Sequence, residues 1–277
     1  MERLTIDAEY VAKRIPPRKR DSHKGMNGVV CVIGGSRLYH GAPFFAAMAA
    51  MRTGVDLVYL AVPNVIASAV RALSPDLIVF PLPDAKLTRG NVAKLKSWIP
   101  DVDTIAIGPG LGYQNEKDIE NGVSQLNDKC KSMVLDADAL RPPILKVVKV
   151  DRAVVTPHAG EFERLFATKL SADLEARVSA VSNAAREHGL TVLLKGPTDV
   201  VSDGRRVALN DTHSPSMTVG GTGDVLTGVT SGLLAKGMEA FDAASCAAFL
   251  NGSAGAEATQ ELGLHITASD VVRHIAT

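Results

Sequence analysis

The sequence contains little cysteine and has no excess of either charge. Its three cysteines, Cys31, Cys130 and Cys246, lie far apart without metal-ligand spacing, so they indicate reduced intracellular thiols rather than disulfides or a zinc site. The 30 basic residues balance the 30 acidic ones, which argues against a nucleic-acid or membrane-surface protein. No apolar run reaches membrane-spanning length, and the N-terminus lacks the order of a signal peptide. We therefore expect a cytoplasmic protein.

Two nucleotide-binding motifs are also missing. No glycine is followed at the spacing of a P-loop by Gly-Lys-Ser/Thr, which excludes the kinases and ATPases built on that loop. The glycines at 108–112 follow an apolar run, but their spacing and the lack of a suitably placed acid exclude a dinucleotide fingerprint. There is no internal repeat or dividing linker. With 277 residues, of which 46% are hydrophobic, the chain can form one large α/β domain without disulfide or metal support.

Apolar runs ending in glycine or acidic residues alternate along the chain with helix-like segments, the pattern of a parallel α/β sheet. The expected strands occupy 28–33, 55–63, 77–80, 103–107, 133–137, 153–156 and 191–194, the last followed by a hairpin-like turn near 204. The expected helices occupy 41–54, 64–73, 90–98, 159–165, a segment from 222, 240–258 and a short one after 270.

The stretch Val219–Gly228 is the strongest local signal. Its glycines, Gly220, Gly221 and Gly223, allow a tight turn with exposed N–H groups, and a long apolar helix follows. Such a helix start binds anions, because its first N–H groups lack partners and the helix dipole is positive there. Asp224 in this place would repel a phosphate, yet could take a proton from a hydroxyl that attacks phosphorus. Alternatively, Asp224 is only a favourable acid in a first helical turn.

Other candidate residues follow the remaining strands. Asp136 and Asp138 end one strand and are expected on one side of it; Asp138 is either a cap or loop acid, or a metal or ribose ligand. His158 follows another strand, and Glu161, three residues later, can close a helix cap. Lys195 either pairs with phosphate or is an exposed strand-end lysine. Because ligands of open α/β sheets bind outside the carboxyl ends of the strands, these loops are expected to converge on one site.

The first 27 residues are polar and carry a basic cluster. We interpret this segment as solvated, because short charge runs mostly face water. A basic rim facing a polyanionic ligand is the alternative. The cluster consists of Arg14, Arg18, Lys19, Arg20 and Lys24.

Taken together, the loops resemble the ADP- or ATP-dependent NAD(P)H-hydrate dehydratases of the ribokinase-like superfamily. The Gly-Asp piece alone is common to many sugar and vitamin kinases, whereas its combination with the other pieces is more specific. The resemblance covers residues from about 20 to 270 in the family's order. The matching pieces are His23–Gly25, Ile33–Ser36 with Tyr39 and Gly41–Pro43, Ile107–Gly112, Leu135–Asp138, Thr156–Glu161, Leu194–Thr198 and Gly220–Asp224.

This resemblance implies a ribokinase-like three-layer α/β/α fold with a mainly parallel central sheet, formed by one domain over residues 1–277. It implies a hydro-lyase that converts the (6S) hydrate of NADH or NADPH back to NAD(P)H at the expense of ADP or ATP, with Mg²⁺ as cofactor. Asp224 matches the family's essential acid and also contacts the substrate. The other implied site residues are Ala42, Gly110 and His158 for the hydrated dinucleotide; Lys195, Gly196, Pro197, Thr198, Asp199 and Gly223 for the adenine nucleotide; Gly221, Thr222 and Gly223 for the moving phosphoryl group; and Glu161 and Asp138 for the metal.

The chain departs from many family members in lacking a fused epimerase domain, so a separate protein would supply that activity. Val219 replaces the usual small residue before the glycines. The resemblance further suggests a homo-oligomer, with a tetramer as one candidate.

Two other functions are compatible with parts of the pattern. A hydroxymethylpyrimidine or hydroxyethylthiazole kinase of the same superfamily is disfavoured because such kinases carry an Asn–Glu pair where this chain has His158 and Glu161. A nucleotide-binding regulator without catalysis is disfavoured because an acid at an anion site does not help binding alone.

Overall fold

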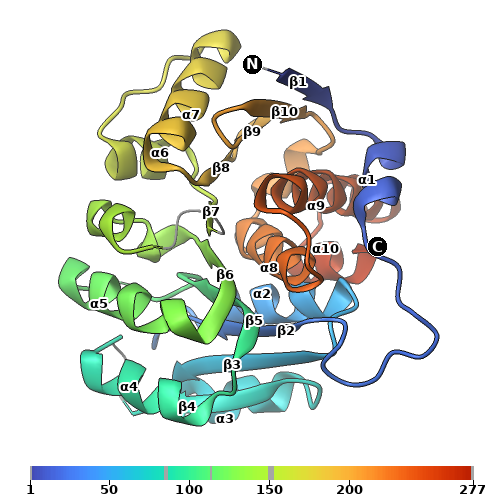
Figure 1. Ribbon diagram of the computed structural model, residues 1–277. Coiled ribbons are helices and arrows are strands. Elements are labelled where there is room, and N and C mark those ends of the chain that lie inside the picture. The colour runs from blue at the N-terminus through green and yellow to red at the C-terminus, as the bar shows by residue number, and fades with distance from the viewer. Residues whose placement is uncertain (1, 84–86, 113, 149–152, 276–277) are drawn as a thin grey trace.

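The computed structural model describes residues 2–83, 87–112, 114–148 and 153–275. One ten-stranded sheet forms its centre, in the order β1-β10-β9-β8-β7-β6-β5-β2-β3-β4, with helices on both sides (Figure 1). This arrangement confirms the expected three-layer α/β/α fold. The strands are β1 (Glu2–Thr5), β2 (Val29–Ile33), β3 (Leu57–Pro63), β4 (Ile78–Leu82), β5 (Val102–Ile107), β6 (Cys130–Leu135), β7 (Ala153–Val155), β8 (Thr191–Leu194), β9 (Asp199–Ser202) and β10 (Arg206–Asn210).

The sheet is mainly parallel, as the apolar runs predict. Only the β8–β9 and β9–β10 pairs are antiparallel among the described strand pairs. The β9–β10 connection is the expected hairpin, and Gly204 at its turn has φ +84°. A Cβ there would lie 2.6 Å from the Cα of Arg186, so a larger residue would disturb both the turn and its packing.

Each inner strand is buried on both faces, because successive side chains point to opposite sides. Val30 and Val32 pack into one core, whereas Cys31 and Ile33 pack into the other. The helices within residues 8–73 and 222–274 contribute to the first core, and those within residues 89–188 contribute to the second. No helix within the described residues is both long and apolar enough to span a bilayer.

The helices are α1 (Ala8–Arg14), α2 (Gly41–Arg52), α3 (Asn64–Leu73), α4 (Arg89–Trp98), α5 (Glu116–Leu126), α6 (Ala159–Phe166), α7 (Leu174–His188), α8 (Thr222–Ala235), α9 (Ala240–Leu262) and α10 (Ala268–His274); short 3₁₀ turns include η2 (Ala137–Ala139) and η5 (Pro215–Thr218). Helices α1, α5 and α7 were not predicted from the sequence. The other helices were predicted, with bounds close to those observed.

The central helix α8 packs against α2 at very short range. A Cβ on Gly228 would lie 2.1 Å from the carbonyl oxygen of Ala46, and one on Gly232 would lie 2.1 Å from Oγ1 of Thr53. The small residues of both helices therefore allow their backbones to touch, and they hold the N-terminus of α8 at a fixed place beside the sheet.

The N-terminal segment is more structured than a solvated lead-in. β1 pairs with β10, and Arg14 of α1 forms an ion pair with Asp242 at 3.1 Å. Arg18 pairs with the buried Asp56 side chain. Residues 2–14 therefore form regular structure and bury Ile6, Tyr10 and Val11, which a solvated lead-in would not do. Most of their charged side chains are nevertheless exposed, as expected. Four members of the basic cluster are exposed as expected, namely Arg18, Lys19, Arg20 and Lys24.

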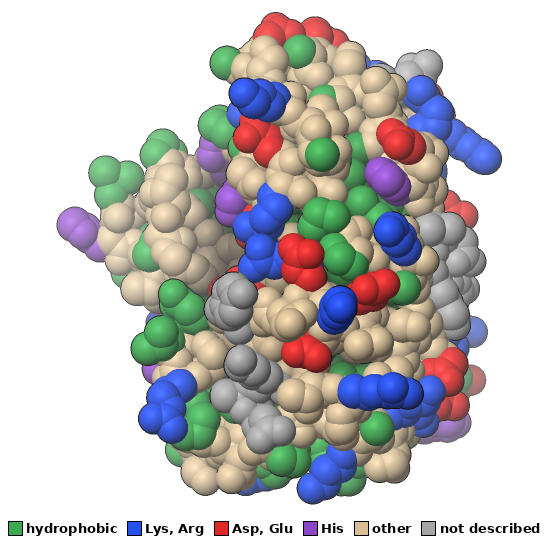
Figure 2. Space-filling model, turned by 90° about the vertical axis from the view of Figure 1, so that its left-hand side faces the viewer, with side chains coloured by type: hydrophobic (Ala, Val, Ile, Leu, Met, Phe, Trp, Pro, Cys, Tyr) green, Lys and Arg blue, Asp and Glu red, His purple; other side chains and the backbone are tan. Residues whose placement is uncertain are grey.

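The balanced charge is also visible on the surface. Figure 2 shows the face covered by α4 to α7, where Lys and Arg side chains are interspersed with Asp and Glu. Such a mixed surface differs from the one-sign face that a nucleic-acid-binding protein presents.

Candidate active site

The strand order reverses between β2 and β5, which both lie in the middle of the sheet. The loops that follow these strands leave in opposite directions, and such a switch point forms a ligand crevice in open α/β sheets. The N–H of Gly35 donates to Pro109 O at 2.8 Å, which ties the two loops together. Gly110 has φ +65°, and a Cβ on it would lie 2.9 Å from that of Ala42. Two predicted substrate-binding residues thus meet at the switch point.

The loop after β6 differs from the prediction. β6 ends at Leu135, and Ala137, with φ +50°, starts the 3₁₀ turn η2. Asp136 and Asp138 therefore do not share one side of a strand, because the chain has left the extended conformation between them. Asp138 Oδ2 accepts from the N–H of Gly112 at 2.8 Å, and burial raises the pKa of Asp138. Asp138 is a loop acid that holds the glycine loop after β5.

His158 and Glu161 begin α6 together. They form a capping box, which confirms the structural role expected of Glu161. The backbone of His158 also forms a bridge with Lys195, so the loop after β7 lies beside the loop after β8. Neighbouring parallel strands bring the two predicted residues together although 37 positions separate them in the sequence.

Lys195 follows β8 and points into a group of carboxylates. Its Nζ lies 2.8 Å from Asp136 Oδ1 and 3.7 Å from Glu161 Oε2. Burial by itself would lower the pKa of Lys195, but these two carboxylates outweigh it and raise that pKa above its ordinary value. The lysine is therefore a paired cation with 20% of its side chain exposed, rather than a free strand-end lysine.

The turn from β8 to β9 contains the other predicted nucleotide-binding residues. Asp199 Oδ1 accepts from the N–H of Gly196 at 3.1 Å, and its Oδ2 accepts from Asn210 at 3.0 Å. Burial raises the pKa of Asp199. Its carboxyl group thus shapes this turn, which also contains Pro197 and Thr198.

The N-terminus of α8 has the geometry expected of an anion site. Gly221 is the N-cap with φ +101° and forms no side-chain cap; a Cβ there would lie 2.8 Å from that of Ala268. The hydroxyl of Thr222 donates backwards to Met217 O at 2.8 Å, which holds the preceding turn. The first intrahelical bond runs from the N–H of Val225 to Gly221 O at 3.0 Å. The backbone N–H groups of residues 222–224 precede this bond, so they point out of the N-terminal end of the helix.

Asp224 stands in this first turn with a strongly shifted pKa. Burial and then the Asp136 carboxylate raise the pKa of Asp224 to about 7, while the Lys195 ammonium opposes this shift. Asp138 and Glu161 add smaller shifts in the same upward direction. The acids predicted from separate loops therefore lie near enough to influence one another. A carboxyl group with a pKa near neutrality can accept and return a proton, which is typical of a general base.

From the sequence, Asp136 was expected only as a strand-end acid without an assigned role, and Thr227 was not predicted. Asp136, with 1% of its surface exposed, accepts from Lys195 and also from the hydroxyl of Thr227 at 2.8 Å. An acid directly after an apolar strand was visible in the sequence, and so was a hydroxyl three residues after Asp224. Neither pattern could reveal that they meet.

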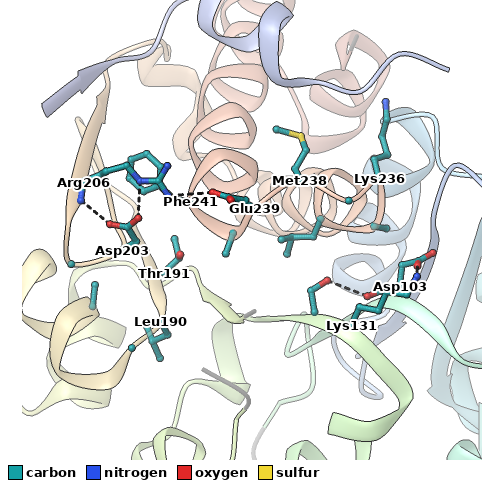
Figure 3. Close-up of a pocket in the computed structure, with 18 of the residues that line it drawn as sticks. Asp103, Lys131, Leu190, Thr191, Asp203, Arg206, Lys236, Met238, Glu239 and Phe241 are labelled. Atoms are coloured by element: carbon teal, nitrogen blue, oxygen red, sulfur yellow. Dashed lines mark hydrogen bonds and ion pairs between the residues drawn. The ribbon is translucent and has the colours of Figure 1, made fainter. Parts of the chain in front are cut away.

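A cavity of about 1020 Å³ lies at the opposite edge of the sheet (Figure 3). Its lining includes the starts of β5, β6 and β8 and the end of α8. Charged groups there pair locally, such as Lys131 with Asp103 at 2.6 Å and Arg206 with Asp203 at 2.8 Å. The described residues that line it include none of the predicted site residues. The carboxyl edge of the strands is therefore the candidate active site.

The fold is shared with known enzymes. The structure superposes with a TM-score of 0.82 on the ADP/ATP-dependent NAD(P)H-hydrate dehydratase from Bacillus subtilis co-crystallised with ATP and Mg²⁺, over 96% of this chain and 95% of that one. The sequence identity is 24%, so this likeness shows the ribokinase-like α/β fold.

Sequence comparisons are more specific. The chain is 52% identical to the ADP-dependent (S)-NAD(P)H-hydrate dehydratase of Cenarchaeum symbiosum over 96% of this chain and 93% of that protein. It is 46% identical to the enzyme of the same name from Nitrosopumilus maritimus over 100% and 97%, respectively. The family model described as NAD(P)H-hydrate dehydratase matches residues 30–277, a range that contains every loop of the candidate site. The chain therefore belongs to the NAD(P)H-hydrate dehydratase family.

Proposed function

We propose that this protein repairs nicotinamide nucleotides by dehydrating the (6S) hydrate of NADH or NADPH, with ADP as the phosphoryl donor. The observation that carries the proposal is Asp224, whose pKa is raised to about 7 at a helix start that has no side-chain cap. Membership in the family supports the reaction, and the names of the two relatives support ADP over ATP.

The chemistry requires a hydroxyl to become a good leaving group. The ring hydroxyl oxygen attacks the terminal phosphorus of ADP while Asp224 accepts the hydroxyl proton, and AMP leaves with the electrons of the broken P–O bond. The lone pair of the ring nitrogen then expels phosphate, and loss of a proton from the neighbouring ring carbon completes the double bond. Hydroxide leaves poorly and phosphate leaves well, so the nucleotide drives the dehydration.

The chain's own groups fit the charges that arise. The backbone N–H groups of Thr222 and Gly223 would stabilise the moving phosphoryl group together with Gly221, an electrostatic role worth about 3 kcal/mol per donor in other enzymes. Lys195 would pair with a phosphate, assisted by the turn from Gly196 to Asp199. Ala42, Gly110 and His158 would contact the hydrated dinucleotide at the switch point.

The residues present are compatible with Mg²⁺. Within the described residues there is no group of three or more His, Cys, Asp or Glu side chains arranged to hold a metal. Mg²⁺ in phosphoryl-transfer sites needs only one or two carboxylates besides phosphates and waters. Glu161 and Asp138 remain the candidate ligands, each with one carboxylate oxygen engaged by a backbone N–H. When bound, Mg²⁺ would neutralise phosphate charge.

The proposal also covers the oligomeric state and cellular location of the enzyme. We expect a homo-oligomer, with a tetramer as one candidate, in the cytoplasm. A separate epimerase would supply the substrate's correct epimer. Size-exclusion chromatography with light scattering would determine the oligomeric state, since each assembly predicts a different multiple of the 29.2 kDa chain.

A repair assay tests the function directly. Purified protein is incubated with hydrated NADH or NADPH, Mg²⁺ and either ADP or ATP, and the absorbance of the reduced nicotinamide ring is followed. We expect recovery with ADP, and a loss of about 1000-fold or more in Asp224→Asn with its fold retained. No recovery with either nucleotide contradicts the proposal. A stable phosphorylated vitamin precursor would instead identify a small-molecule kinase.

A further inference from the structure

Asp136 occupies a fixed position at the end of β6, beside the end of β5. Its N–H donates to Ile107 O at 3.1 Å, and its carbonyl oxygen accepts from the N–H of Ala139 at 3.0 Å. A Cβ on Gly108 would lie 1.8 Å from that carbonyl oxygen, so the backbones of the two loops are in direct contact. These backbone contacts therefore fix the position from which the Asp136 side chain extends.

The carboxylate of Asp136 joins two other elements. Oδ1 accepts from the ammonium of Lys195 and Oδ2 from the hydroxyl of Thr227, both at 2.8 Å. Both oxygens of this buried group are thus engaged, as a buried charge requires. One partner comes from the end of β8 and the other from the interior of α8.

The first partner, Lys195, lies where the phosphate groups of a nucleotide would bind. A Cβ on Gly223 would lie 3.4 Å from its Nζ, so the ammonium adjoins the first turn of α8. A lysine side chain is long and flexible and forms hydrogen bonds in many directions. Asp136 restricts it to one position, with Glu161 at 3.7 Å as the second carboxylate.

The second partner, Thr227, lies within the same helix as Asp224. Its hydroxyl also lies 3.1 Å from Gly223 O, within the first turn of α8. The bond to Asp136 therefore ties the rotation of that turn to the loop after β6. One carboxylate fixes both the cation and the helix that supplies the base.

We propose that Asp136 is a positioning residue, which holds the Lys195 ammonium and the first turn of α8 in the arrangement that aligns a bound phosphoryl group with Asp224. The inference rests on the proposed function. Asp136 does not touch the substrate in this account. It acts through Lys195 and Thr227, because its two oxygens are engaged by these residues.

A double-mutant cycle tests whether Asp136 acts through Lys195 or independently of it. Asp136→Asn, Lys195→Met and the double variant are compared in kcat and in KM for ADP. We expect Asp136→Asn to lower kcat/KM by about 10- to 100-fold, as small misplacements of reacting groups do. The double variant should fall below Lys195→Met only by the several-fold loss expected of Thr227→Val, because the part of the Asp136 effect that acts through Lys195 is already absent. If the kcat/KM losses of the two single variants multiply in the double variant, or if Asp136→Asn leaves kcat/KM unchanged, the proposal is overturned.

A matched variant controls for lost stability. Asp103→Asn breaks another ion pair of the same sheet, with Lys131 at 2.6 Å, at the opposite edge. It should lower the unfolding temperature while leaving kcat and KM unchanged. If Asp136→Asn does not fold, Thr227→Val decides, because it leaves the Asp136–Lys195 pair in place. We expect a several-fold lower kcat with an unchanged KM for ADP, and an unchanged kcat would contradict the inference.

Binding measurements separate this inference from the proposed function. If the wild-type protein lacks repair activity, the proposed function has failed, whereas activity in the wild type and equal activity in Asp136→Asn rejects only the positioning role. ADP affinity is measured calorimetrically for the same variants in either case. Asp136→Asn should weaken ADP binding about tenfold, and its effect should disappear when Lys195 is already methionine. Persistence of the effect in that background would overturn the inference.

Discussion

The Nδ1 atom of His158 and the carboxylate of Glu161 cap the same helix from opposite directions. Nδ1 accepts from the N–H groups of Gly160 and Glu161 at 3.1 and 3.3 Å, and Oε2 of Glu161 accepts from the N–H of His158 at 2.9 Å. A neutral imidazole that accepts at Nδ1 must carry its proton on Nε2. That Nε2 lies 3.3 Å from Glu161 Oε1, and 60% of the His158 side chain is exposed.

Substitutions of His158 should separate its two roles. His158→Ala removes the cap and should lower the free energy of unfolding by about 1 kcal/mol, whereas His158→Asn retains a capping side chain and most of that stability. Both variants lose the Nε2 donor and should raise KM for the hydrated dinucleotide about tenfold. Denaturant unfolding and steady-state kinetics measure the two effects. A normal KM in His158→Asn would show that the imidazole serves only the helix.

The pH dependence of catalysis should follow Asp224. Burial and then Asp136 raise the pKa of its carboxyl group to about 7, and a general base works only when it is ionised. We expect kcat/KM to increase about tenfold per pH unit below pH 7 and to level off above it. Measurement between about pH 5 and 9 tests this. A profile that stays flat down to about pH 5 would mean that Asp224 keeps an ordinary pKa.

The same pKa shift predicts a cost in stability. The pKa of Asp224 is about 7 in the folded protein and 3.8 without the fold's influence, so the folded state binds the extra proton between these values. Its contribution to stability therefore falls as pH rises from about 4 to 7 and stays low above. Asp224→Asn should be more stable than the wild type at pH 8, by about 1–4 kcal/mol, despite its inactivity. Urea unfolding at pH 8 and near pH 4.5 measures this, and an equal difference at both pH values would contradict it.

The expected sheet and helices could be predicted because the inner strands are apolar runs, and three of them, β2, β5 and β6, are followed directly by glycine or an acid. The bounds of α3, Asn64–Leu73, match the expected 64–73. Loops after parallel strands share one edge, so the strand-end loops could be expected to converge without knowledge of the strand order. The assignment of Ala42, Gly110 and His158 to the dinucleotide came from the family resemblance.

The contacts within this site could not be predicted from the sequence, because they join residues far apart in it. Asp136, Lys195 and Thr227 meet only because α8 packs against β6 and β7 alone separates β6 from β8. No periodicity in the sequence encodes that arrangement. The residues after β6 were misjudged because the turn at Ala137, with φ +50°, gives no signal in an Asp-Ala-Asp sequence. The short β1 was missed because its polar residues pair with β10 instead of filling a core.

Gly110 should tolerate no side chain, because both its conformation and its surroundings exclude one. Its φ is +65°, and an added Cβ would lie 2.8 Å from Tyr39 O and 2.9 Å from the Cβ of Ala42. Gly110→Ala should therefore displace the start of α2, lower stability by about 1–3 kcal/mol and raise KM for the hydrated dinucleotide about tenfold or more.

Gly90 offers the matched control for this substitution. It lies in the first turn of α4, and an added Cβ there would meet no atom within 4 Å. Gly90→Ala should leave KM unchanged and increase stability by up to about 1 kcal/mol, because alanine favours the helix. Thermal unfolding and kinetics of both variants test the pair. A normal KM in Gly110→Ala would show that the hydrated dinucleotide does not bind where the loops after β2 and β5 meet.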